Sequence, residues 1–575
     1  MNPTLPDWNT LRLITPELWL VTGMCAVILV PFIRRASSTL PAMTALVALA
    51  AALISVPAFT LPVRTLVLGD MLAIDPFSQF FKVLLIAFTM LVTVQWMLAG
   101  RHRQHPYDVP DFFCLLLGAA FGMALMASAA NLLLIFIATE SASFPSYALA
   151  GFRKRTRTGS EAALKYVIFG AAASAVMVYG MSMIYGATGT LDLGQVAAAA
   201  GAVPSPMLAV GLLALFAGVA FKLSAVPMHF WCPDVFEGAP IEVTTFLSVA
   251  SKGAAVALLL RIVQAFPGAS SGEMFTGLAV GVAILGAVTA TWGNLVALHQ
   301  TNIKRLLAYS SIAHSGYMIM AASLMAVATS LPRQEAIASA LLFYLAVYLF
   351  MNMGAFTVAA LIALRTGSED IRDYAGMIAR SPALAVLMTV FLLSLFGMPG
   401  LGGFMGKINL MVVMSEAGAG GFALIAVLLV NTLISLYYYM RPVYFMMFVP
   451  DRQGRPAVVA SAAGLALLAV CTVALLWTGI VPGMLQGATD DYAQIFTRSK
   501  PPVLDPLSPG ERVGVRGSAD DDGVMMQAAF VHHRHQHAAP LPGSPHPAPQ
   551  SLPGVGHPLP AGEGDAVATT RTANP

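Results

Sequence analysis

The chain has 575 residues, of which 57% are hydrophobic and only 10% are charged, and its mean hydropathy is +0.75. Soluble globular domains are about 45–50% apolar and about 25% charged, so this composition excludes a soluble enzyme, a secreted disulfide scaffold and a nucleic-acid-binding protein. The formal net charge of +3 is too small to indicate a polyanionic partner. We therefore expect a polytopic, all-α membrane protein.

Fourteen apolar segments are long enough to cross a membrane. A bilayer core of about 30 Å requires about 20 helical residues at a rise of 1.5 Å per residue. The predicted spans lie near residues 17–33, 39–60, 76–98, 109–129, 131–151, 161–186, 205–229, 240–264, 276–297, 303–325, 334–364, 381–412, 420–446 and 457–481. Only Ala130 and Asn131 separate the fourth span from the fifth. The two longest segments are expected to contain a tilt, a bend or part of a loop.

The basic residues between these spans indicate an orientation. The odd-numbered loops carry 16 lysines and arginines, whereas the even-numbered loops carry only Arg64, Arg261 and Arg333. Because cytoplasmic loops are enriched in Lys and Arg, the odd loops are predicted to be cytoplasmic and both termini periplasmic. A misplaced span would scramble this alternation, so the counts support the number of spans as well.

The composition changes at the C-terminal end, which divides the chain into a membrane domain over 1–497 and a tail over 498–575. The last 75 residues hold 13 of the 37 prolines and 6 of the 11 histidines, so we expect a disordered tail. The cluster of His532, His533, His535 and His537 could bind a metal, but a solvated tract is the simpler interpretation.

The sequence predicts no cofactor or metal site in the membrane domain. The four cysteines, Cys25, Cys114, Cys232 and Cys471, are far apart, and they show no CxxC or Cys/His ligand spacing. Iron–sulfur clusters and structural zinc are therefore not expected. The N-terminal segment contains one early cation, Arg12, and no small-residue cleavage site, so we do not interpret it as a signal or transit peptide.

Four ionisable residues are predicted at membrane depth, where a charge usually marks a transport path or a buried pair. Glu140 lies near the middle of the fifth span, and the lysines of the seventh, eighth and twelfth spans are Lys222, Lys252 and Lys407. The alternative for each lysine is that its ammonium reaches the lipid headgroups. The alternative for Glu140 is a protonated carboxyl that links two helices. Headgroup contact is the simpler interpretation for lysines at the start of a span, which are Lys165 and Lys304.

The seventh and twelfth spans are predicted to be broken helices. Pro227 lacks the N–H that the carbonyl of Leu223 needs, and Pro399 has the same effect on Leu395. Unpaired backbone at membrane depth is tolerated only next to protein or a water-filled cavity. The two spans are five apart and so cross the membrane in opposite directions. This arrangement is typical of an inverted repeat with a site near the midplane.

Further polar residues lie at helical spacing with these charges. Thr245, Ser248 and Lys252 share one face of the eighth span, and His229, seven residues after Lys222, is predicted on the same face as that lysine. Ser310, His314 and Tyr317 share a face of the tenth span. His314 is either a histidine satisfied between helices or a member of a proton relay.

Four stretches carry a resemblance to a known family. They are SEAALKYVIFGAAASAVMVYGMSMIYGATGTLDL (160–193), AFKLSAVPMHFWCPDVFEGAPIEVTTFLSVASKGAA (220–255), GNLVALHQTNIKRLLAYSSIAHSGYMIM (293–320) and LSLFGMPGLGGFMGKI (393–408). The chain resembles the antiporter-like membrane subunits of respiratory complex I, the NADH–quinone oxidoreductase, from about residue 12 to about 497. HFWCPDVFEGAP and SVASKGAA favour the subunit N branch over its paralogues L and M. Lys407, where subunit M has a glutamate, agrees.

The resemblance implies a fold and a function. It implies fourteen spans with two inverted five-helix repeats and broken helices 7 and 12, in a proton-translocating subunit of a bacterial inner-membrane complex. Neighbouring membrane subunits would be its partners. NADH, FMN, iron–sulfur clusters and quinone would be bound by other subunits, with no redox centre on this chain.

Individual residues acquire roles through the same resemblance. Glu140 would pair with Lys222, Lys252 would be a bridging lysine, and Lys407 would end the axis. His229, His314 and Lys165 would be secondary proton-transfer positions.

Three other functions compete with this interpretation. The chain could belong to a multi-subunit cation/proton antiporter or to a related membrane-bound hydrogenase. A purely structural scaffold would not need buried charges across several helices. A quinone-binding catalytic subunit is disfavoured because no cofactor motif is visible.

Overall fold

The structure, a computed structural model, describes residues 8–34, 37–56, 64–100, 105–154, 156–202, 206–265, 272–451, 454–455 and 457–493. The predicted tail over 498–575 and its histidine cluster lie outside these residues, so the division into a membrane domain and a tail stays a prediction.

Helices occupy each of the fourteen ranges predicted from the apolar pattern. Up to the first break they are α1 (Trp8–Leu13), α2 (Thr15–Ile33), α3 (Thr39–Ser55), α4 (Pro76–Gln95), η1 (Trp96–Gly100), η2 (Pro106–Asp108), α5 (Val109–Ser128), α6 (Leu132–Ala150), α7 (Arg157–Thr188), α8 (Leu193–Ala202) and α9 (Pro206–Leu223). A short antiparallel hairpin of β1 (Thr65–Val67) and β2 (Leu72–Ile74) precedes α4, with Leu66 opposite Ala73.

The remaining helices follow in chain order. They are α10 (Trp231–Gly238), α11 (Ile241–Phe246), η3 (Leu247–Ser251), α12 (Lys252–Ala265), α13 (Gly272–Ala297), α14 (Ile303–Ser323), η4 (Leu324–Val327), α15 (Leu331–Thr366), η5 (Ile371–Tyr374), α16 (Met377–Arg380), α17 (Pro382–Phe396), α18 (Gly402–Ser415), α19 (Gly418–Phe448), α20 (Ala462–Ile480) and α21 (Gly483–Tyr492). Among the described helices, twelve are long and apolar enough to cross a membrane, while α3 and α17 are shorter apolar helices.

Side-chain caps explain where several of these helices begin. The Asp75 carboxylate accepts a hydrogen bond from the Ser78 N–H at the start of α4. The Asn131 side chain accepts from the Leu133 N–H, so α5 and α6 are separate helices although only three residues lie between them. Thr156 caps α7 through the Gly159 N–H. Such caps satisfy N–H groups that the first helical turn leaves free.

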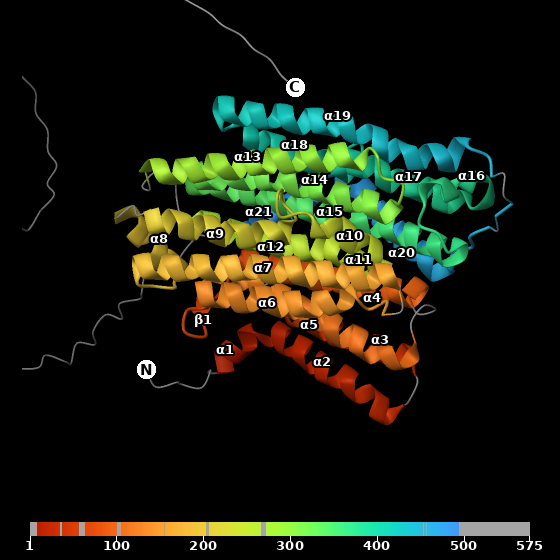
Figure 1. The fold of residues 1–575 in the computed structure, drawn as a ribbon, viewed down its shortest axis with the longest axis horizontal. Helices are drawn as coiled ribbons and strands as arrows, with labels where there is room; N and C mark the ends of the chain where they lie inside the picture. The colour runs from red at the N-terminus through yellow and green to blue at the C-terminus, as the bar shows by residue number, and fades with distance from the viewer. Residues whose placement is uncertain are drawn as a thin grey trace, which may run out of the picture. The chain divides into compact units, whose positions relative to one another are not determined.

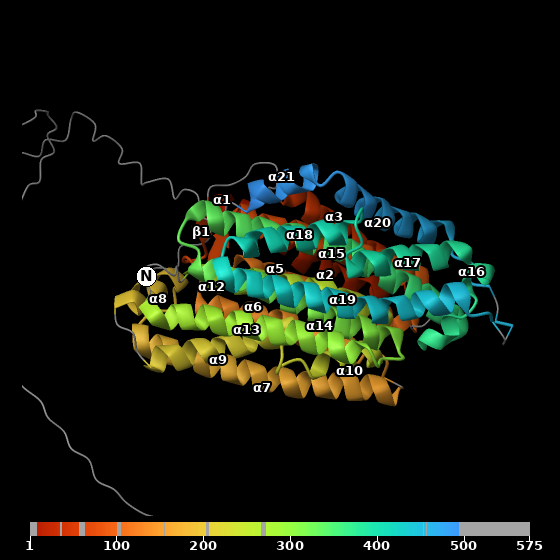
Figure 2. The same ribbon diagram turned by 90° about the horizontal axis from the view of Figure 1, so that it is seen from above.

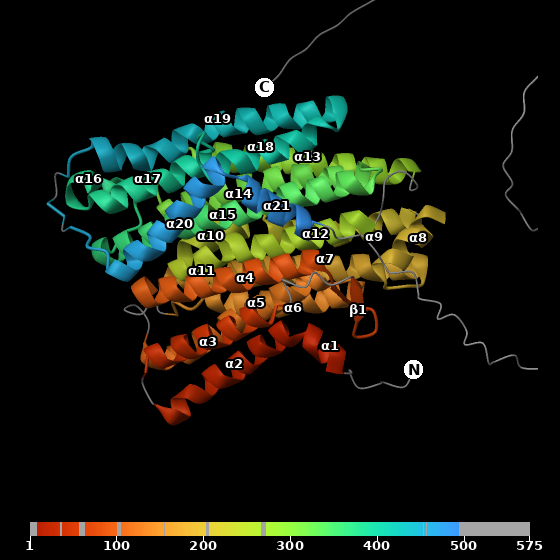
Figure 3. The ribbon, with the colours of Figure 1, turned by 180° about the vertical axis from the view of Figure 1, so that it is seen from behind.

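The helices lie side by side, with α2 and α3 at one edge and α18 and α19 at the other (Figure 1). Seen from above, α7 and α9 lie on one side and α20 and α21 on the opposite side (Figure 2). From behind, α20 and α21 lie in front of α15, which both of them contact (Figure 3). Helices α11, α12, α14 and α15 therefore lie in the middle of the bundle.

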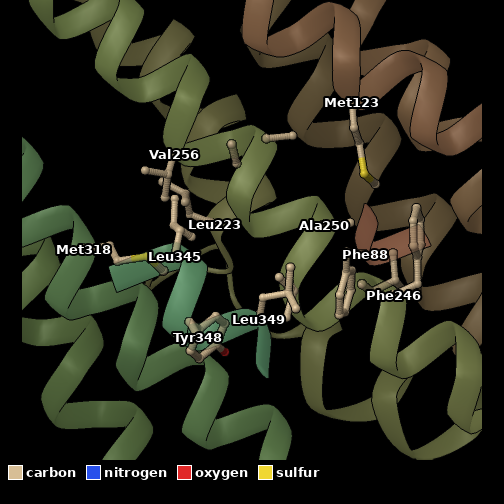
Figure 4. Close-up of a cluster of buried hydrophobic side chains, with 14 of the residues drawn as sticks. Phe88, Met123, Leu223, Phe246, Ala250, Val256, Met318, Leu345, Tyr348 and Leu349 are labelled. Carbon is tan, nitrogen blue, oxygen red and sulfur yellow. The ribbon is translucent and has the colours of Figure 1, made fainter. Parts of the chain in front are cut away.

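Burial follows this arrangement. The span formed by α11, η3 and α12 is 100% buried, whereas α19 is mostly exposed and presents large apolar side chains such as Leu433 and Tyr437. Apolar side chains on outer helices are expected where lipid is the solvent. The core cluster includes Leu223, Val256, Met318 and Leu345, which come from four different spans (Figure 4).

Small residues permit the close contact between α13 and α14. A Cβ built on Gly316 would lie 2.4 Å from the backbone nitrogen of Ala290, and one on Gly286 would lie 2.7 Å from that of Met320. No larger side chain could occupy these positions without moving a backbone. Close approach through glycine is a common way for membrane helices to associate without a hydrophobic driving force.

Two spans are interrupted, as predicted. In the seventh, α9 ends at Leu223 and α10 begins only at Trp231. In the twelfth, α17 ends at Phe396 and α18 begins at Gly402, with Gly397 and Gly400 at φ +94° and +87° between them. These positive φ values favour glycine. The eighth span has a further irregularity, because the π-helical turn η3 ends directly before Lys252.

Candidate functional site

Lys222 lies at the end of the first half of the broken seventh span. It is the penultimate residue of α9, and its side chain is buried. Its ammonium donates a hydrogen bond of 2.5 Å to the hydroxyl of Ser143 on α6, and it lies 5.9 Å from the ring centroid of Tyr147. The interruption after Leu223 thus leaves a lysine pointing into the interface between the fifth and seventh spans.

Glu140 lies on the same helix as Ser143, three residues earlier. Its carboxylate accepts a hydrogen bond from the hydroxyl of Ser174 on α7. It is close enough to Lys222 to interact with it electrostatically, but the two groups form no direct ion pair in the described structure. Lys222 thus contacts Ser143 and Glu140 contacts Ser174, so the acid and the base that the sequence predicted as a pair do not touch directly.

Lys252 begins α12, directly after the π-helical turn η3, and is completely buried. Its ammonium nitrogen has no hydrogen-bond partner in the described part of the chain. The nitrogen lies 5.9 Å from the ring centroid of Phe236 on α10. An uncompensated buried charge is costly, so a proton on Lys252 is stable only while water or a neighbouring group compensates it.

Lys407 lies in α18, the second half of the broken twelfth span. Its ammonium donates a hydrogen bond of 2.6 Å to the carbonyl of Phe396, the last residue of α17. A second bond of 3.2 Å reaches the hydroxyl of Thr432 on α19, and the ammonium lies 5.5 Å from the ring centroid of Tyr317. The lysine thus satisfies a carbonyl that the helix break leaves without an intrahelical partner.

His314 connects several spans from the centre of α14. Its Nδ1 lies 2.6 Å from the hydroxyl of Tyr344 on α15, and its Nε2 lies 3.2 Å from the hydroxyl of Tyr439 on α19. Tyr439 in turn lies 2.5 Å from the hydroxyl of Ser310. The predicted stripe of Ser310, His314 and Tyr317 therefore exists, and its polar atoms are hydrogen-bonded. His314 is at once a satisfied interhelical histidine and part of a connected polar network.

His229 and Lys165, the remaining two predicted residues, make other contacts. The prediction that helical spacing puts His229 on the face of Lys222 is wrong, because α9 ends at Leu223; the His229 ring instead lies 5.9 Å from the ring of Trp292 on α13. The Lys165 ammonium lies 2.6 Å from an oxygen of Asp234 and 2.7 Å from one of Glu161. Lys165 therefore belongs to a partly exposed ion-pair cluster.

Comparison with known proteins places this arrangement in a family. The family model described as "NADH:quinone oxidoreductase/Mrp antiporter, TM" matches residues 129–435. NADH-quinone oxidoreductase subunit N of Anaeromyxobacter sp. (strain Fw109-5) is 40% identical over 511 residues, which cover 84% of this chain and 96% of that protein. The chain belongs to the subunit N family of NADH-quinone oxidoreductases. It is accordingly a proton-translocating membrane subunit of that class of complex.

Other relatives agree with this assignment. Subunit N of Geobacillus kaustophilus (strain HTA426) is 36% identical, and the match covers 83% of this chain and 95% of that protein. A chain of respiratory complex I from Thermus thermophilus with bound aureothin is 33% identical, with a TM-score of 0.69 over 83% of this chain and 99% of that chain. A chain of the Mrp complex from Dietzia sp. DQ12-45-1b has a TM-score of 0.70 at 20% identity, covering 84% and 97%, and this similarity shows a shared fold alone.

Within this subunit N family member, two buried ion pairs were missed by the sequence analysis. Lys82 of α4 and Glu17 of α2 are 2.7 Å apart, and both side chains are buried. Arg261 of α12 makes a bidentate contact with Asp75 at 2.9 and 2.7 Å. Arg261 therefore lies inside a helix, although the count of basic residues had placed it in an even-numbered loop. The signal for both pairs was present, because each cation stands within an apolar run, but only the three-dimensional structure supplies the partner.

The arrangement can hold and exchange protons. Lysine amines, a carboxylate and an imidazole are groups that gain and lose protons, and hydroxyls between them can extend a hydrogen-bonded path. The three lysines lie on spans that are broken or irregular near the lysine, which exposes backbone groups to the same interior. Among the described residues, no three His, Cys, Asp or Glu side chains are grouped as metal ligands.

Proposed function

We propose that this chain carries protons across the membrane along an axis of Glu140, Lys222, Lys252, His314 and Lys407. The supporting observation is that three buried lysines lie beside irregularities of their own spans. Lys222 is at the end of α9, Lys252 directly follows η3, and Lys407 lies in α18 with its ammonium on the carbonyl that ends α17. An acid and a base that attract each other can hold a proton-loaded state and release it when the attraction is weakened. Quinone reduction elsewhere in the complex supplies the energy.

The proposal includes a membrane topology. The fourteen helical ranges cross the membrane as fourteen spans, arranged as two inverted five-helix repeats whose broken members are the seventh and twelfth. The odd-numbered loops face the cytoplasm of a bacterial cell and both termini face the periplasm. The 16 basic residues of the odd loops support this orientation.

The proposal also includes partners and cofactors. The chain works as one membrane subunit of a hetero-oligomeric complex, beside other membrane subunits and in contact with lipid. NADH, FMN, iron–sulfur clusters and quinone are bound by other subunits, and no cofactor is held by this chain. The similarity to subunit N of NADH-quinone oxidoreductase and to a chain of respiratory complex I supports this assignment.

The alternative function is that of a subunit in a multi-subunit cation/proton antiporter. The similarity to the Mrp complex, at 20% identity, supports only a common fold. The relatives at 36–40% identity over most of the chain are subunit N proteins. Co-purification with flavin and iron–sulfur subunits would support the first function, whereas co-purification with other antiporter subunits would support the second.

Substitution of Lys222 tests the axis. Methionine keeps the apolar stem of lysine but cannot carry a proton, so Lys222→Met should leave the complex assembled and NADH oxidation by an artificial acceptor intact. Quinone reduction and proton pumping should fall together, because a blocked channel stalls a tightly coupled complex. Lys222→Arg should not rescue pumping, since arginine hardly deprotonates in proteins. The measurement is quinone reduction and acidification, in parallel, in membrane vesicles.

Lys154→Met is the matched control. Lys154 has a side chain that is 65% exposed, and its ammonium lies 3.4 Å from the carboxylate of Asp108 and 5.6 Å from the ring centroid of Phe152. The same substitution there should leave pumping near the wild-type rate. Full pumping by Lys222→Met would remove Lys222 from the axis and, with it, the central relay.

A further inference from the structure

A large polar cavity opens among the odd-numbered loops. Its volume is about 1330 Å³. The lining comes from segments that are distant in the sequence, among them His105, Asp108, residues 152–154, Pro240, Asn302 and residues 367–370. The wall includes both cations and carboxylates, among them Arg153, Asp108, Glu237 and Glu369. A cavity of this size and polarity holds many water molecules.

Glu242 is the buried carboxylate of this cavity. It is the second residue of α11 and lines the cavity, yet only 1% of its surface is exposed. A carboxylate is rarely buried to this degree unless charge or hydrogen bonds compensate it. The position thus combines contact with a water-filled space and shielding from bulk solvent.

Lys304 supplies a compensating charge beside it. The Lys304 side chain is fully buried at the start of α14, and its ammonium lies 2.9 Å from an oxygen of Glu369. The same ammonium donates a 3.0 Å hydrogen bond to the carbonyl of Ala239, three residues before Glu242, and it interacts electrostatically with Glu242. Lys304 thus brings one cation close to the carboxylates of both Glu369 and Glu242.

A polar stripe leads from Glu242 into the membrane. Glu242, Thr245, Ser248 and Lys252 follow each other at intervals of three or four residues along the eighth span, which passes through the π-helical turn η3 before Lys252. The distance along the helix axis is about 15 Å, from ten residues at 1.5 Å. All four residues are buried, and the hydroxyls of Thr245 and Ser248 donate to the carbonyls of Ile241 and Thr245. Both hydroxyl oxygens retain acceptor capacity for a water molecule.

We propose that Glu242 is the group that takes up protons from this cavity and passes them to Lys252. A hydronium ion in the cavity protonates the Glu242 carboxylate. The resulting carboxylic acid releases the proton through water hydrogen-bonded to Thr245 and Ser248, and the neutral amine of Lys252 accepts it, which restores the carboxylate. The proposal rests on the proposed function, because it adds an uptake step to the axis and uses the cytoplasmic orientation of the odd loops.

Two substitutions at Glu242 test the step. In inside-out membrane vesicles, Glu242→Gln should lower proton pumping and quinone reduction by roughly tenfold or more, because an amide cannot relay a proton. Glu242→Asp should retain a larger part of both rates. Glu237→Gln is the matched control, since Glu237 lines the same cavity but is paired with Arg305 and is 38% exposed. Pumping at the wild-type rate by Glu242→Gln would overturn the proposal.

A second measurement does not depend on replacing a buried charge. Thr158 lines the cavity and is exposed. A membrane-impermeant, bulky thiol reagent added outside inside-out vesicles should inhibit quinone reduction when the chain carries Thr158→Cys, and should spare the unsubstituted complex. If Glu242→Gln fails to assemble, this measurement decides: inhibition supports the cavity as the uptake route, and unchanged turnover excludes it.

The two proposals fail differently. Loss of pumping in Lys222→Met together with full pumping in Glu242→Gln would reject the uptake step and keep the axis. Full pumping in both variants would reject the proposed function itself.

Discussion

At the residue scale, the contact between Asp75 and Arg261 joins three helices in one buried unit. The guanidinium holds the Asp75 carboxylate with two nitrogens and donates from its Nε to the carbonyl of Ala127 at 2.6 Å. Asp75 also caps α4, so a single carboxylate begins one helix and fixes another. Bidentate arginine contacts are strong and directional, and this one lies where α4, α5 and α12 meet.

Breaking this pair should destabilise the subunit. Removing one partner of a buried ion pair leaves an uncompensated charge, which costs about 3–5 kcal/mol. Arg261→Met should therefore lower the thermal unfolding temperature of the purified complex and reduce the amount assembled in membranes. The double variant Asp75→Asn/Arg261→Met should regain part of that loss, because asparagine can still cap α4 without a charge. If the single variant is as stable as the wild type, the pair has no structural role.

At the scale of elements, the break in the twelfth span depends on close contact between its two halves. A Cβ on Gly403 would lie 1.8 Å from the carbonyl oxygen of Ser394, which belongs to the last turn of α17. The Gly403 N–H donates a hydrogen bond of 3.3 Å to the Ser394 hydroxyl, because no earlier turn of α18 supplies a carbonyl for it. The half-helices are thus packed backbone against backbone.

Gly403→Ala should disturb this packing, because the obstructing atom belongs to the backbone and cannot rotate away. Overpacking of this kind costs about 1–3 kcal/mol, and here it should also displace Lys407 from the carbonyl of Phe396. The expected result is reduced pumping with a smaller loss of assembly. Gly420→Ala in α19 is the control, since no atom lies within 4 Å of its added Cβ. Equal activities of the two alanine variants would contradict the expectation.

At the scale of the whole molecule, the orientation of every site depends on which loops face the cytoplasm. The cavity with Glu242 and the ion-pair cluster of Lys165, Asp234 and Arg305 both belong to the odd-loop side. On the opposite side, Asp192 forms an isolated bridge with Asn131 between the fourth-to-fifth and sixth-to-seventh connections. The proposed direction of proton uptake therefore depends on the membrane topology.

A reporter that is active only in the cytoplasm can establish this topology. Fused after Arg157 it should be active, because the basic residues of that loop favour the cytoplasmic side. Fused after Asp192 it should be inactive, because one span separates the two positions. Activity at Asp192 would overturn both the orientation and the number of spans that precede it.

The sequence was most informative about the helices and least informative about contacts between them. Apolar runs of about 20 residues predicted the positions of the helices in the fourteen apolar ranges, because the bilayer sets their length, whereas the connecting helices α8, α10 and α16 were not predicted. Lys222, Lys252 and Lys407 could be selected because a charge inside such a run is rare. The partners of His314 could not be predicted from the sequence. Tyr344 and Tyr439 are 30 and 125 residues away, and only packing brings them together.

Errors arose where a helical rule was applied beyond the end of a helix. The seven-residue spacing of Lys222 and His229 has meaning only in continuous helix, and α9 ends between them. Arg261 was counted among loop cations although it lies within the predicted span 240–264, and the structure places it inside α12, which ends at Ala265. Glu242 was passed over because it stands near the start of a span, where an acidic residue is ordinary.

The bond between the Lys407 ammonium and the Phe396 carbonyl makes the geometry of the twelfth span sensitive to charge. A protonated lysine has three donors and can hold both this carbonyl and the Thr432 hydroxyl. When the proton leaves, the amine keeps only two weaker donors, while the carbonyl stays buried and needs a partner that costs about 1–3 kcal/mol to lose. The contact between the two half-helices is consequently stronger when Lys407 is protonated, which links the protonation state of this lysine to the geometry of the break.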